Sequence, residues 1–435
     1  MIPPFESETS VNVTVLGLGY IGLPTAAMLA EAGCRVDGYD VDERRRAALR
    51  AGDFGNEAEV ASVAVDAVLS GRLHIVDTLS PSDAFILCVP TPTHDHRPDL
   101  SYVEAATRAV APLLRPGDLI VLESTVPPGT VERVVVGAIR SAGGDPDAYR
   151  IAHCPERVIP GAIVHELRNN ARVIGGRRPG DAEHARELYA LFARGDIHVT
   201  DCVTAELVKV VENTYRDVNI AFANELALLC EELDVDAWET IRLANQHPRV
   251  AILAPGPGVG GHCIPVDPHF LSNANPFVTE LIQTARRVNE RMPAAIVRRI
   301  AMHLPVTDDS VTVTLLGAAY KPNVDDTRES PTERIDDLLH ERGYRTRVYD
   351  PIARSFSRPL CTSLEEAAQD SDALVLVTEH DVFRSIDPVA VRALMRTPLL
   401  YCSRPALDLE AWRSAGFTVS VLGARSAPAP VLSAT

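Results

Sequence analysis

The segment GLGYIG at residues 17–22 limits the fold of this 435-residue chain more than any other feature. A short β-branched run at 11–16 comes directly before it, and residues 24–32 follow as an alanine-rich helical pattern. A strand, a glycine turn and a helix in this order are typical of a doubly wound parallel sheet. Strand-like runs that alternate with helical patterns continue this theme at 35–39, 84–89 and 119–122.

The same segment has the residue types that bind a dinucleotide. Of Gly17, Gly19 and Gly22, one makes the tight turn, one lets the backbone approach a pyrophosphate, and one permits close helix packing. Asp40 ends the next strand, about 20 residues on, where its carboxylate would accept ribose hydroxyls and repel a 2′-phosphate. NAD is therefore favoured over NADP. The alternative is that the glycines only join a strand to a helix and that Asp40 is a solvated strand-end carboxylate. Further cofactor contacts are predicted at two strand ends, by Thr91 and Thr125.

The rest of the chain predicts a helical middle and a second sheet. Residues 204–233 form a long helical pattern without proline, with apolar residues on most faces, so this helix is expected to be buried along its length. A Pro/Gly-rich loop at 255–268 separates the shorter helical patterns 237–244 and 279–303. A second β-branched strand begins at Val311. The predicted fold class is α/β, with two Rossmann-like doubly wound domains joined by a long central helix and a helical middle domain. The predicted domains are residues 1–203, 204–305 and 306–435.

Composition and charge exclude several other classes of protein. A net charge of −17 argues against a nucleic-acid binder, which would show a basic stripe. No apolar run is long enough to span a membrane, and residues 1–10 lack the regions of a signal peptide, so a cytoplasmic protein is expected. The eight cysteines show neither CxxC pairs nor zinc-site spacing, so no metal is predicted. The Pro-rich tail after about Ser426 is expected to be mobile.

The loop PGPGVGGHCIPVDP predicts a reactive thiol. Its four glycines let the backbone approach a ligand, and Asp267 follows Cys263 by four residues. A cysteine is most often a small buried hydrophobe, but one held with a carboxylate in a Gly/Pro loop is better interpreted as a nucleophile. Asp267 or Glu156 could position the water that cleaves a thioester formed on it.

The long helix offers groups that could stabilise an oxyanion. Lys209 and Asn213 lie four residues apart and Arg216 continues their face, so two cations and an amide project together. Lys209 could instead snorkel or pair with Glu206, three residues earlier. A nucleophilic cysteine, an oxyanion site and NAD together can oxidise an alcohol or an aldehyde to an acid.

The chain resembles the UDP-glucose/UDP-mannuronate dehydrogenase family through GLGYIGLP, VPTP, ESTVPPGT, CPERVIPG, KVVENTYRDVNIAFANE, PGPGVGGHCIPVDP and YKPNVDDTRESP. The forms CPERVIPG, ANQHPRV and PGPGVGGHC are most similar to its UDP-N-acetyl-D-mannosamine branch. The resemblance implies an N-terminal NAD domain, a helical dimerisation segment that makes a homodimer or higher oligomer, and a C-terminal domain for the UDP half of the substrate. It implies NAD-dependent four-electron oxidation of a UDP-sugar at C6. UDP-N-acetylglucosamine or UDP-glucose remain alternative substrates, and a non-catalytic NAD-binding sensor or scaffold is an alternative of another class.

The resemblance also implies roles for individual residues. Cys263 matches the nucleophile, Lys209 the acid/base or oxyanion lysine, Asn213 the helper amide and Asp267 the water-handling carboxylate. The residues that match substrate contacts are Glu156, Arg157, Val158, Lys209, Asn213, Arg216, His247, Arg249, Gly260, Tyr320 and Lys321. The residues that match further cofactor contacts are Tyr20, Ile21, Arg45 and Arg328.

Some of these positions have other interpretations. His247 could be a helix C-terminal cap or a solvated side chain, and Arg249 and Arg328 could be surface charges. His269 departs from the family pattern, in which an aromatic residue is expected after the Asp-Pro pair. The residues that line the sugar pocket are therefore expected to differ from those of the family at this position.

Overall fold

A computed structural model of the chain describes residues 11–54, 58–158, 161–304 and 310–425. The ten N-terminal residues and the tail after Ser426, about which the sequence made predictions, lie outside the described residues. The chain divides into two compact units. The first contains residues 1–212 and 269–275, and the second contains residues 213–268 and 276–435. The division into three domains stays a prediction.

The first unit contains a sheet of eight strands in the order β10-β9-β8-β7-β4-β1-β2-β3. The strands are β1 (Asn12–Leu16), β2 (Arg35–Tyr39), β3 (Leu73–Ile75), β4 (Ala84–Leu87), β7 (Leu119–Leu122), β8 (Arg150–His153), β9 (Arg172–Gly176) and β10 (Ile197–Asp201). Within it, β3-β2-β1-β4-β7-β8 run parallel in the strand order of a dinucleotide-binding fold. The last two strands run the other way, because β9 pairs antiparallel with β8 and β10 is parallel to β9.

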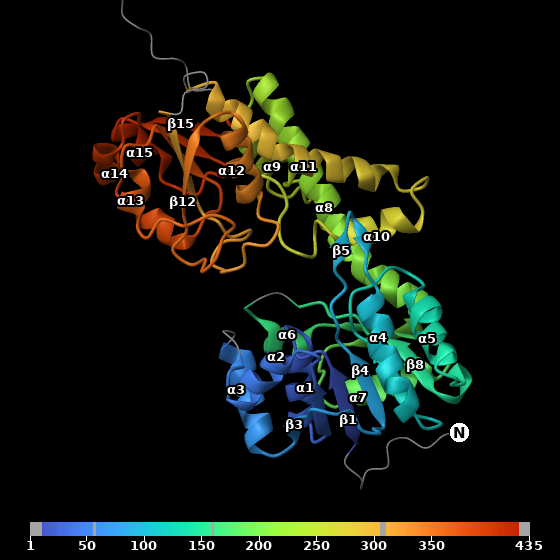
Figure 1. Cartoon of the computed structure of the whole chain (residues 1–435). Helices are drawn as coiled ribbons and strands as arrows, with labels where there is room; N and C mark the ends of the chain where they lie inside the picture. Colours follow the sequence, from blue (N-terminus) through green and yellow to red (C-terminus); the bar gives the residue numbers. More distant parts are fainter. Residues whose placement is uncertain (1–10, 55–57, 159–160, 305–309, 426–435) are drawn as a thin grey trace, which may run out of the picture. The chain divides into compact units, whose positions relative to one another are not determined.

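Helices cover both faces of this sheet (Figure 1). They are α1 (Gly22–Glu31), α2 (Glu43–Arg50), α3 (Ala58–Leu69), α4 (Ser101–Val110), α5 (Val136–Ser141), α6 (Ile163–Asn169) and α7 (Asp181–Tyr189), with the short turns η1 (Ala111–Leu113), η2 (Val131–Val135) and η3 (Pro146–Ala148) and the hairpin β5 (Thr93–His94) and β6 (Arg97–Pro98). Neighbouring strand residues alternate between the two cores, as Ile86 faces one and Phe85 the other. Both faces are therefore buried, which explains why β4 and β7 are apolar at every position.

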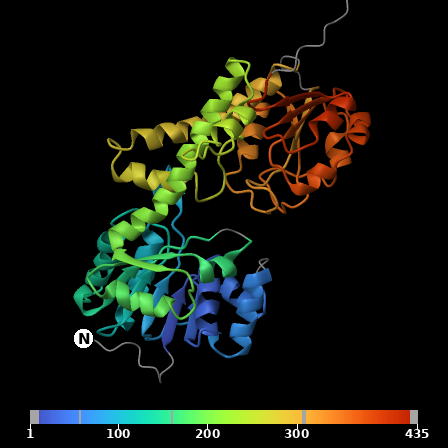
Figure 2. The same cartoon turned by 180° about the vertical axis from the view of Figure 1, so that it is seen from behind.

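The second unit contains a parallel sheet of five strands in the order β12-β11-β13-β14-β15. Its elements are α9 (Ala237–Ala244), α11 (Glu280–Ala301), β11 (Thr312–Leu316), α12 (Pro331–Glu341), β12 (Arg345–Tyr349), α13 (Leu364–Ala368), β13 (Ala373–Leu376), η4 (Asp381–Ser385), α14 (Pro388–Leu394), β14 (Leu399–Cys402), α15 (Leu409–Ser414) and β15 (Thr418–Val421). Helices lie on both sides of this sheet as well (Figure 2). The predicted fold class, α/β with two Rossmann-like sheets, is confirmed.

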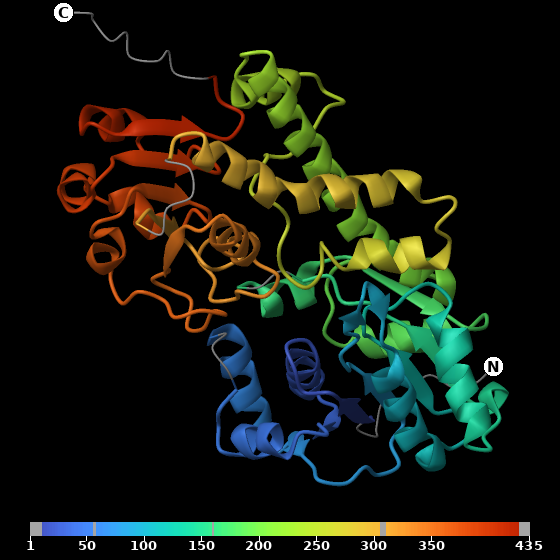
Figure 3. The same ribbon diagram turned by 45° about the horizontal axis from the view of Figure 1, so that its top comes forward.

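The long helix α8 (Cys202–Glu232) begins in the first unit and continues into the second. In the second unit α11 packs across it (Figure 3), where Arg286 forms an ion pair with Asp217 and Asn289 accepts a hydrogen bond from Asn224. The prediction that this helix is buried along its length is wrong for the single chain. Its exposed apolar side chains are Val203, Leu207, Val211, Tyr215, Phe222 and Leu229.

One further boundary differs from the sequence prediction. The loop expected at 255–268 ends earlier, because Asp267 is already the first residue of α10 (Asp267–Ala274). A carboxylate at the start of a helix is favoured by the free backbone N–H groups there. Among the described residues, no helix is long and apolar enough to cross a membrane.

Candidate active site

The glycine turn after β1 leaves open space for a ligand. Gly17 has φ +90°, and a Cβ there would run into the carbonyl of Cys88. A Cβ on Gly22 would likewise meet the carbonyl of Gly17, so neither position admits a side chain. A Cβ on Gly19, in contrast, would have no atom within 4 Å. A pyrophosphate can therefore approach the backbone at Gly19, beside the N-terminus of α1.

Asp40 lies beside this turn and helps to hold it. Its carboxylate accepts hydrogen bonds from the N–H of Leu18 (2.8 Å) and of Asp42 (2.9 Å) and stays half-exposed. The Nε of Arg45 donates to the carbonyl of Leu18 at 3.1 Å. These contacts place Asp40 and Arg45 at the carboxyl edge of the sheet, where a bound adenosine ribose would lie.

The other predicted cofactor residues lie in this first unit too. The hydroxyl of Thr91 donates to the carbonyl of Thr125 at 2.7 Å, which joins the ends of β4 and β7. Ile21 is the N-cap of α1, and the side chain of Tyr20 is exposed beside it. Arg328 belongs to the second unit. The open turn, the adjacent carboxylate and the joined strand ends fit NAD.

Glu156 is held in a buried ion pair rather than left exposed. Its Oε2 lies 3.3 Å from Arg172 Nη1, and its Oε1 accepts the N–H of Arg157 at 2.6 Å. The guanidinium of Arg172 stacks over the rings of Tyr189 and Phe192. This arrangement ties Glu156 to the core of the first unit.

The neighbours of Glu156 are anchored as well. Arg157 forms an ion pair with Glu212 on α8, and half-buried Val158 packs against the core.

Glu206, the alternative partner considered for Lys209, forms hydrogen bonds with another part of the first unit. The carboxylate of Glu206 accepts hydrogen bonds from the N–H groups of Gly129 and Val131, at the start of η2. Glu206 is fully buried, and burial raises its pKa to about 7. Glu206 therefore stabilises the loop before η2, and Lys209 is half-buried one helical turn before Asn213.

The loop that holds Cys263 joins the groups expected around a nucleophile. The carbonyl of Cys263 accepts the N–H of Val266 (3.1 Å) and of Asp267 (2.9 Å), which makes a tight turn. Asn213 Nδ2 donates to Asp267 Oδ2 at 2.6 Å, so α8 is connected directly to the loop. Cys263 is half-buried, whereas Asp267 is only 3% exposed. Three predicted residues, Cys263, Asp267 and Asn213, are thus brought together.

Close packing explains the paired glycines before Cys263. A Cβ on Gly260 would lie 2.7 Å from the Cβ of Tyr320 and 2.6 Å from the carbonyl of Glu329. Gly261 has φ +83°, and a Cβ there would lie 2.8 Å from the ring of Tyr320. Its N–H donates to the carbonyl of Arg328 at 3.1 Å. The loop therefore rests on the segment that contains Tyr320, Lys321 and Arg328.

Charged groups surround this contact. Arg328 binds Asp326 with two hydrogen bonds, of 2.9 and 2.6 Å, and His262 Nδ1 lies 4.0 Å from the same carboxylate. Burial raises the pKa of Tyr320, and the positive charge of Arg216 acts in the opposite direction. Arg216 is exposed on α8. Arg328 therefore contacts the Cys263 loop through its backbone carbonyl, while its guanidinium is paired with Asp326.

Two residues that the sequence interpretation missed hold the start of the loop. The amide oxygen of Asn224 accepts the N–H of Gly256 at 2.8 Å, and Arg404 Nε donates to the carbonyl of Pro255 at 3.2 Å. Arg404 also forms an ion pair with Glu379. It lies 149 residues from Pro255, so no local pattern could have indicated it.

His247, Arg249 and His269 lie apart from these contacts. His247 and Arg249 are exposed after α9 and bond to each other, and the N–H of His247 donates to the carbonyl of Ala244. In the first unit, the ring centroids of His269 and His96 are 4.1 Å apart, so the imidazole of His269 makes the kind of ring contact that an aromatic residue would make. No group of residues in the described part of the chain could hold a metal ion.

A parallel dinucleotide-binding sheet with an open glycine turn and a strand-end carboxylate defines an NAD-dependent oxidoreductase. Family comparison places the chain within this class. It matches the UDP-glucose/GDP-mannose dehydrogenase family in its NAD binding domain (residues 11–193), central domain (203–291) and UDP binding domain (314–409). The chain belongs to this family and is an NAD-dependent UDP-sugar dehydrogenase, which confirms the resemblance and the cofactor.

Individual relatives support the same family. The chain is 43% identical to a UDP-N-acetyl-D-mannosamine dehydrogenase of Methanocaldococcus jannaschii, over 95% of this chain and 96% of the relative. It is 42% identical to the enzyme of that name from Escherichia coli K12, over 86% and 95%. A structure of UDP-D-ManNAc dehydrogenase from Pyrococcus horikoshii is similar with a TM-score of 0.88 and 39% identity, over 96% of this chain and all of that one.

Proposed function

We propose that this enzyme oxidises the C6 alcohol of UDP-N-acetyl-D-mannosamine to the carboxylate, with Cys263 as the covalent nucleophile. The reaction consumes two NAD⁺ and one water and yields UDP-N-acetyl-D-mannosaminuronate, two NADH and three protons. The observation that carries the proposal is the turn from Cys263 to Asp267, tied to Asn213 on α8. The two relatives above, at 43% and 42% identity, support the choice of sugar.

The described residues suggest how the chemistry is divided. NAD, when bound at Gly17–Gly22, supplies the hydride acceptor for both oxidations. Lys209 and Asn213 stabilise the oxyanion as the alcohol loses its proton and hydride. The Cys263 thiolate then adds to the resulting aldehyde to form a thiohemiacetal, which a second oxidation converts into a thioester. Water cleaves the thioester, which releases the carboxylate and regenerates the thiol, with Asp267 or Glu156 positioning the water.

The substrate is expected to bind through the predicted contact residues. Gly260 lies directly against Tyr320, and Lys321 follows Tyr320 on the same segment. Arg216, His247, Arg249 and the segment Glu156, Arg157 and Val158 complete the proposed set, in which cationic side chains serve the diphosphate. Arg328 is proposed to reach the cofactor, as Tyr20, Ile21 and Arg45 do.

We further propose a homodimer that forms through α8. The exposed apolar side chains of α8 fall within an arc of about 120° if each residue turns the helix by 100°. Lys209, Asn213 and Arg216 lie on the opposite side of the same helix. A second copy can therefore cover the apolar face without blocking the catalytic one.

The cellular site and the domain division are part of the same proposal. None of the eight cysteines, all of which lie in the described part of the chain, forms a disulfide. A nucleophilic thiol stays active where thiols remain reduced, so we place the enzyme in the cytoplasm. We assign residues 1–203 to the NAD domain, 204–305 to dimerisation and catalysis, and 306–435 to UDP binding.

The experiment that tests the function measures NADH formed per UDP-sugar. UDP-N-acetyl-D-mannosamine, UDP-N-acetylglucosamine and UDP-glucose are compared by rate and by stoichiometry. We expect the first to react fastest and to yield two NADH per sugar. A faster reaction with either of the others would replace the substrate, one NADH per sugar would indicate a plain alcohol dehydrogenase, and no NADH would indicate a sensor.

The Cys263→Ser variant is the control for the nucleophile. It should bind NAD as the wild type does, because Cys263 belongs to the other compact unit, yet it should form no acid. Full activity in this variant would refute the assignment of Cys263.

A further inference from the structure

The sheet of the second unit repeats the glycine turn of the first. Gly317 has φ +91°, and its N–H donates to the carbonyl of Tyr349 at 2.9 Å. In the first unit, Gly17 has φ +90° and bonds to Tyr39 at 2.8 Å. An aspartate ends the second strand in each case, so Asp350 occupies the position that Asp40 has in the first sheet.

The two carboxylates have different surroundings. Asp350 is 6% exposed, and its Oδ2 accepts the N–H groups of Ala318 (2.7 Å) and Ala319 (3.0 Å). Its Oδ1 accepts two more N–H groups after β12, both at 2.8 Å. His380 Nε2 lies 2.9 Å from Oδ2 as a fifth partner. Asp40 is half-exposed and can still receive a ribose beside its two N–H donors, whereas the buried carboxylate of Asp350 takes part in five hydrogen bonds within the protein.

His380 connects this carboxylate to the next part of the loop. It is 1% exposed, and its Nδ1 accepts the N–H of Asn323 at 2.9 Å, so the neutral tautomer with a proton on Nε2 satisfies both bonds. Asn323 has φ +62° and exchanges two hydrogen bonds with Asp381. The loop from Ala318 to Asn323 is therefore fixed at both ends.

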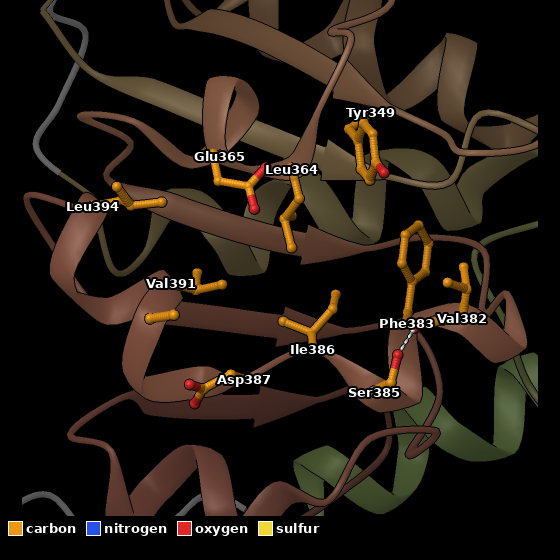
Figure 4. A pocket seen from close by; sticks show the side chains of 11 residues that line it. Tyr349, Leu364, Glu365, Val382, Phe383, Ser385, Ile386, Asp387, Val391 and Leu394 are labelled. Atoms are coloured by element: carbon orange, nitrogen blue, oxygen red, sulfur yellow. Dashed lines mark hydrogen bonds between the residues drawn. The ribbon is translucent and has the colours of Figure 1, made fainter.

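An aromatic contact fixes the ring of His380 from the side. Phe383 meets it edge to face, with the ring centroids 5.4 Å apart. Phe383 and Tyr349 also line a cavity of about 300 Å³ (Figure 4). The imidazole thus lies between a carboxylate, a backbone N–H and an aromatic wall, where a rotation would break two hydrogen bonds.

The fixed loop carries the residue on which the Cys263 loop rests. Tyr320 lies between Ala319 and Asn323, and its ring is in van der Waals range of Gly261. The N–H of Tyr320 also donates to the carbonyl of Asp326 at 3.0 Å. A shift of this loop would move Tyr320 and with it the support of the Cys263 loop.

We propose that His380 and Asp350 are positioning residues that hold the Tyr320–Lys321 loop, and through it the Cys263 loop, in the geometry that binds a uridine diphosphate. The proposal rests on the proposed function for the identity of the ligand. The aspartate at the end of the second strand is thus proposed to bind a ribose in the first sheet and to hold a loop in the second. Both side chains are buried, so they would act through the loop that they hold.

The test compares His380→Ala, which loses both hydrogen bonds, with His380→Gln, which keeps a donor toward Asp350. The matched control is Ser371→Ala. Ser371 is equally buried and bonds to Thr314 on β11 and to Ala367 on α13, but it lies before β13, at the opposite edge of the sheet. UDP and NAD are titrated separately by calorimetry. The rate of Cys263 alkylation by iodoacetamide is followed by peptide mass spectrometry.

In His380→Ala we expect UDP binding to weaken about tenfold or more, as small displacements in a binding site do. Cys263 alkylation should change at least about threefold, and NAD binding should be unaltered. His380→Gln should fall between this variant and the wild type, and it is the decisive variant if His380→Ala does not fold. Wild-type UDP binding and alkylation in His380→Gln, or effects no larger than those of Ser371→Ala, would overturn the proposal. If the wild type oxidised no UDP-sugar, the proposed function would fail, but UDP titration and alkylation would still decide the positioning role.

Discussion

At the residue scale, two carboxylates compete for the role of positioning the hydrolytic water. Asp267 follows Cys263 within one turn and accepts a hydrogen bond from Asn213. Glu156 is neutralised by Arg172, whose guanidinium is itself buried. Glu156 has to keep this pairing, because leaving the buried guanidinium of Arg172 unpaired would cost several kcal/mol. The contacts therefore favour Asp267.

This difference predicts distinct kinetics for Asp267→Asn and Glu156→Gln. Hydrolysis follows both oxidations, so Asp267→Asn should release a burst of two NADH per active site and then turn over about a hundredfold more slowly, as expected for loss of a general base. Stopped-flow absorbance measures the burst, and intact-protein mass spectrometry detects the acyl group on Cys263. If Glu156→Gln gave the burst and Asp267→Asn did not, the roles would be reversed. Cys263→Ala, which removes the side-chain atom that could be acylated, is the control.

At the scale of elements, we propose that α8 serves catalysis with one face and dimerisation with the other. One face carries Lys209 and Asn213, and the other exposes apolar side chains such as Phe222 (55% exposed) and Leu229 (52%). Exposed apolar residues are common singly, but a continuous stripe on a long helix marks an interface. In the proposed homodimer, a second copy of the chain would bury the apolar face of α8 that is exposed in the single chain.

The double variant Phe222→Glu/Leu229→Glu should convert the enzyme into a monomer. Two charges within an apolar interface would each have to be buried without a partner, which disfavours association. Size-exclusion chromatography with light scattering measures the mass. Leu69→Glu is the matched control, because Leu69 is an exposed apolar residue (80%) at the end of α3. A wild type that is already monomeric, or a double variant that remains dimeric, would contradict this interface.

At the scale of the whole molecule, the chain consists of two compact units with separate cores. The glycine turn and Asp40 belong to the first unit, whereas the Cys263 loop and Tyr320 belong to the second. The NAD site and the proposed UDP site are therefore built on different cores, and each ligand should stabilise mainly its own unit.

Differential scanning calorimetry can separate these two effects. NAD at about a hundred times its Kd should stabilise the first unit by about 2.7 kcal/mol, and UDP should do the same for the second. We expect two transitions, each raised by one ligand. An Asp40→Ala variant should lose the NAD shift and keep the UDP shift. A single transition raised equally by both ligands would show that the units unfold together.

Much of the fold could be predicted from the sequence because its signals are local. The glycine turn at 17–22, the strand at Arg35–Tyr39 and the helix at Ala237–Ala244 each follow from residues within a few positions of one another. The start of α10 at Asp267 was missed, since a Pro/Gly-rich loop and a helix N-cap use similar residues.

The site was predicted only in part, for the same physical reason. Cys263, Asp267 and Asn213 could be named because each lies in a distinctive local motif. Arg404, Asn224 and His380 could not be named, since their hydrogen bonds join segments far apart in the sequence.

The amino-acid sequence by itself determined the class of fold, the dinucleotide turn and the candidate nucleophile, because backbone conformation at glycine and the periodicity of apolar residues are local properties. The tertiary structure alone decided which polar groups are paired. It buried Glu156 against Arg172, left Asp267 with Asn213 and closed Asp350 with His380. Such pairings follow from which segments the packing brings within hydrogen-bond distance, and no local pattern contains that information.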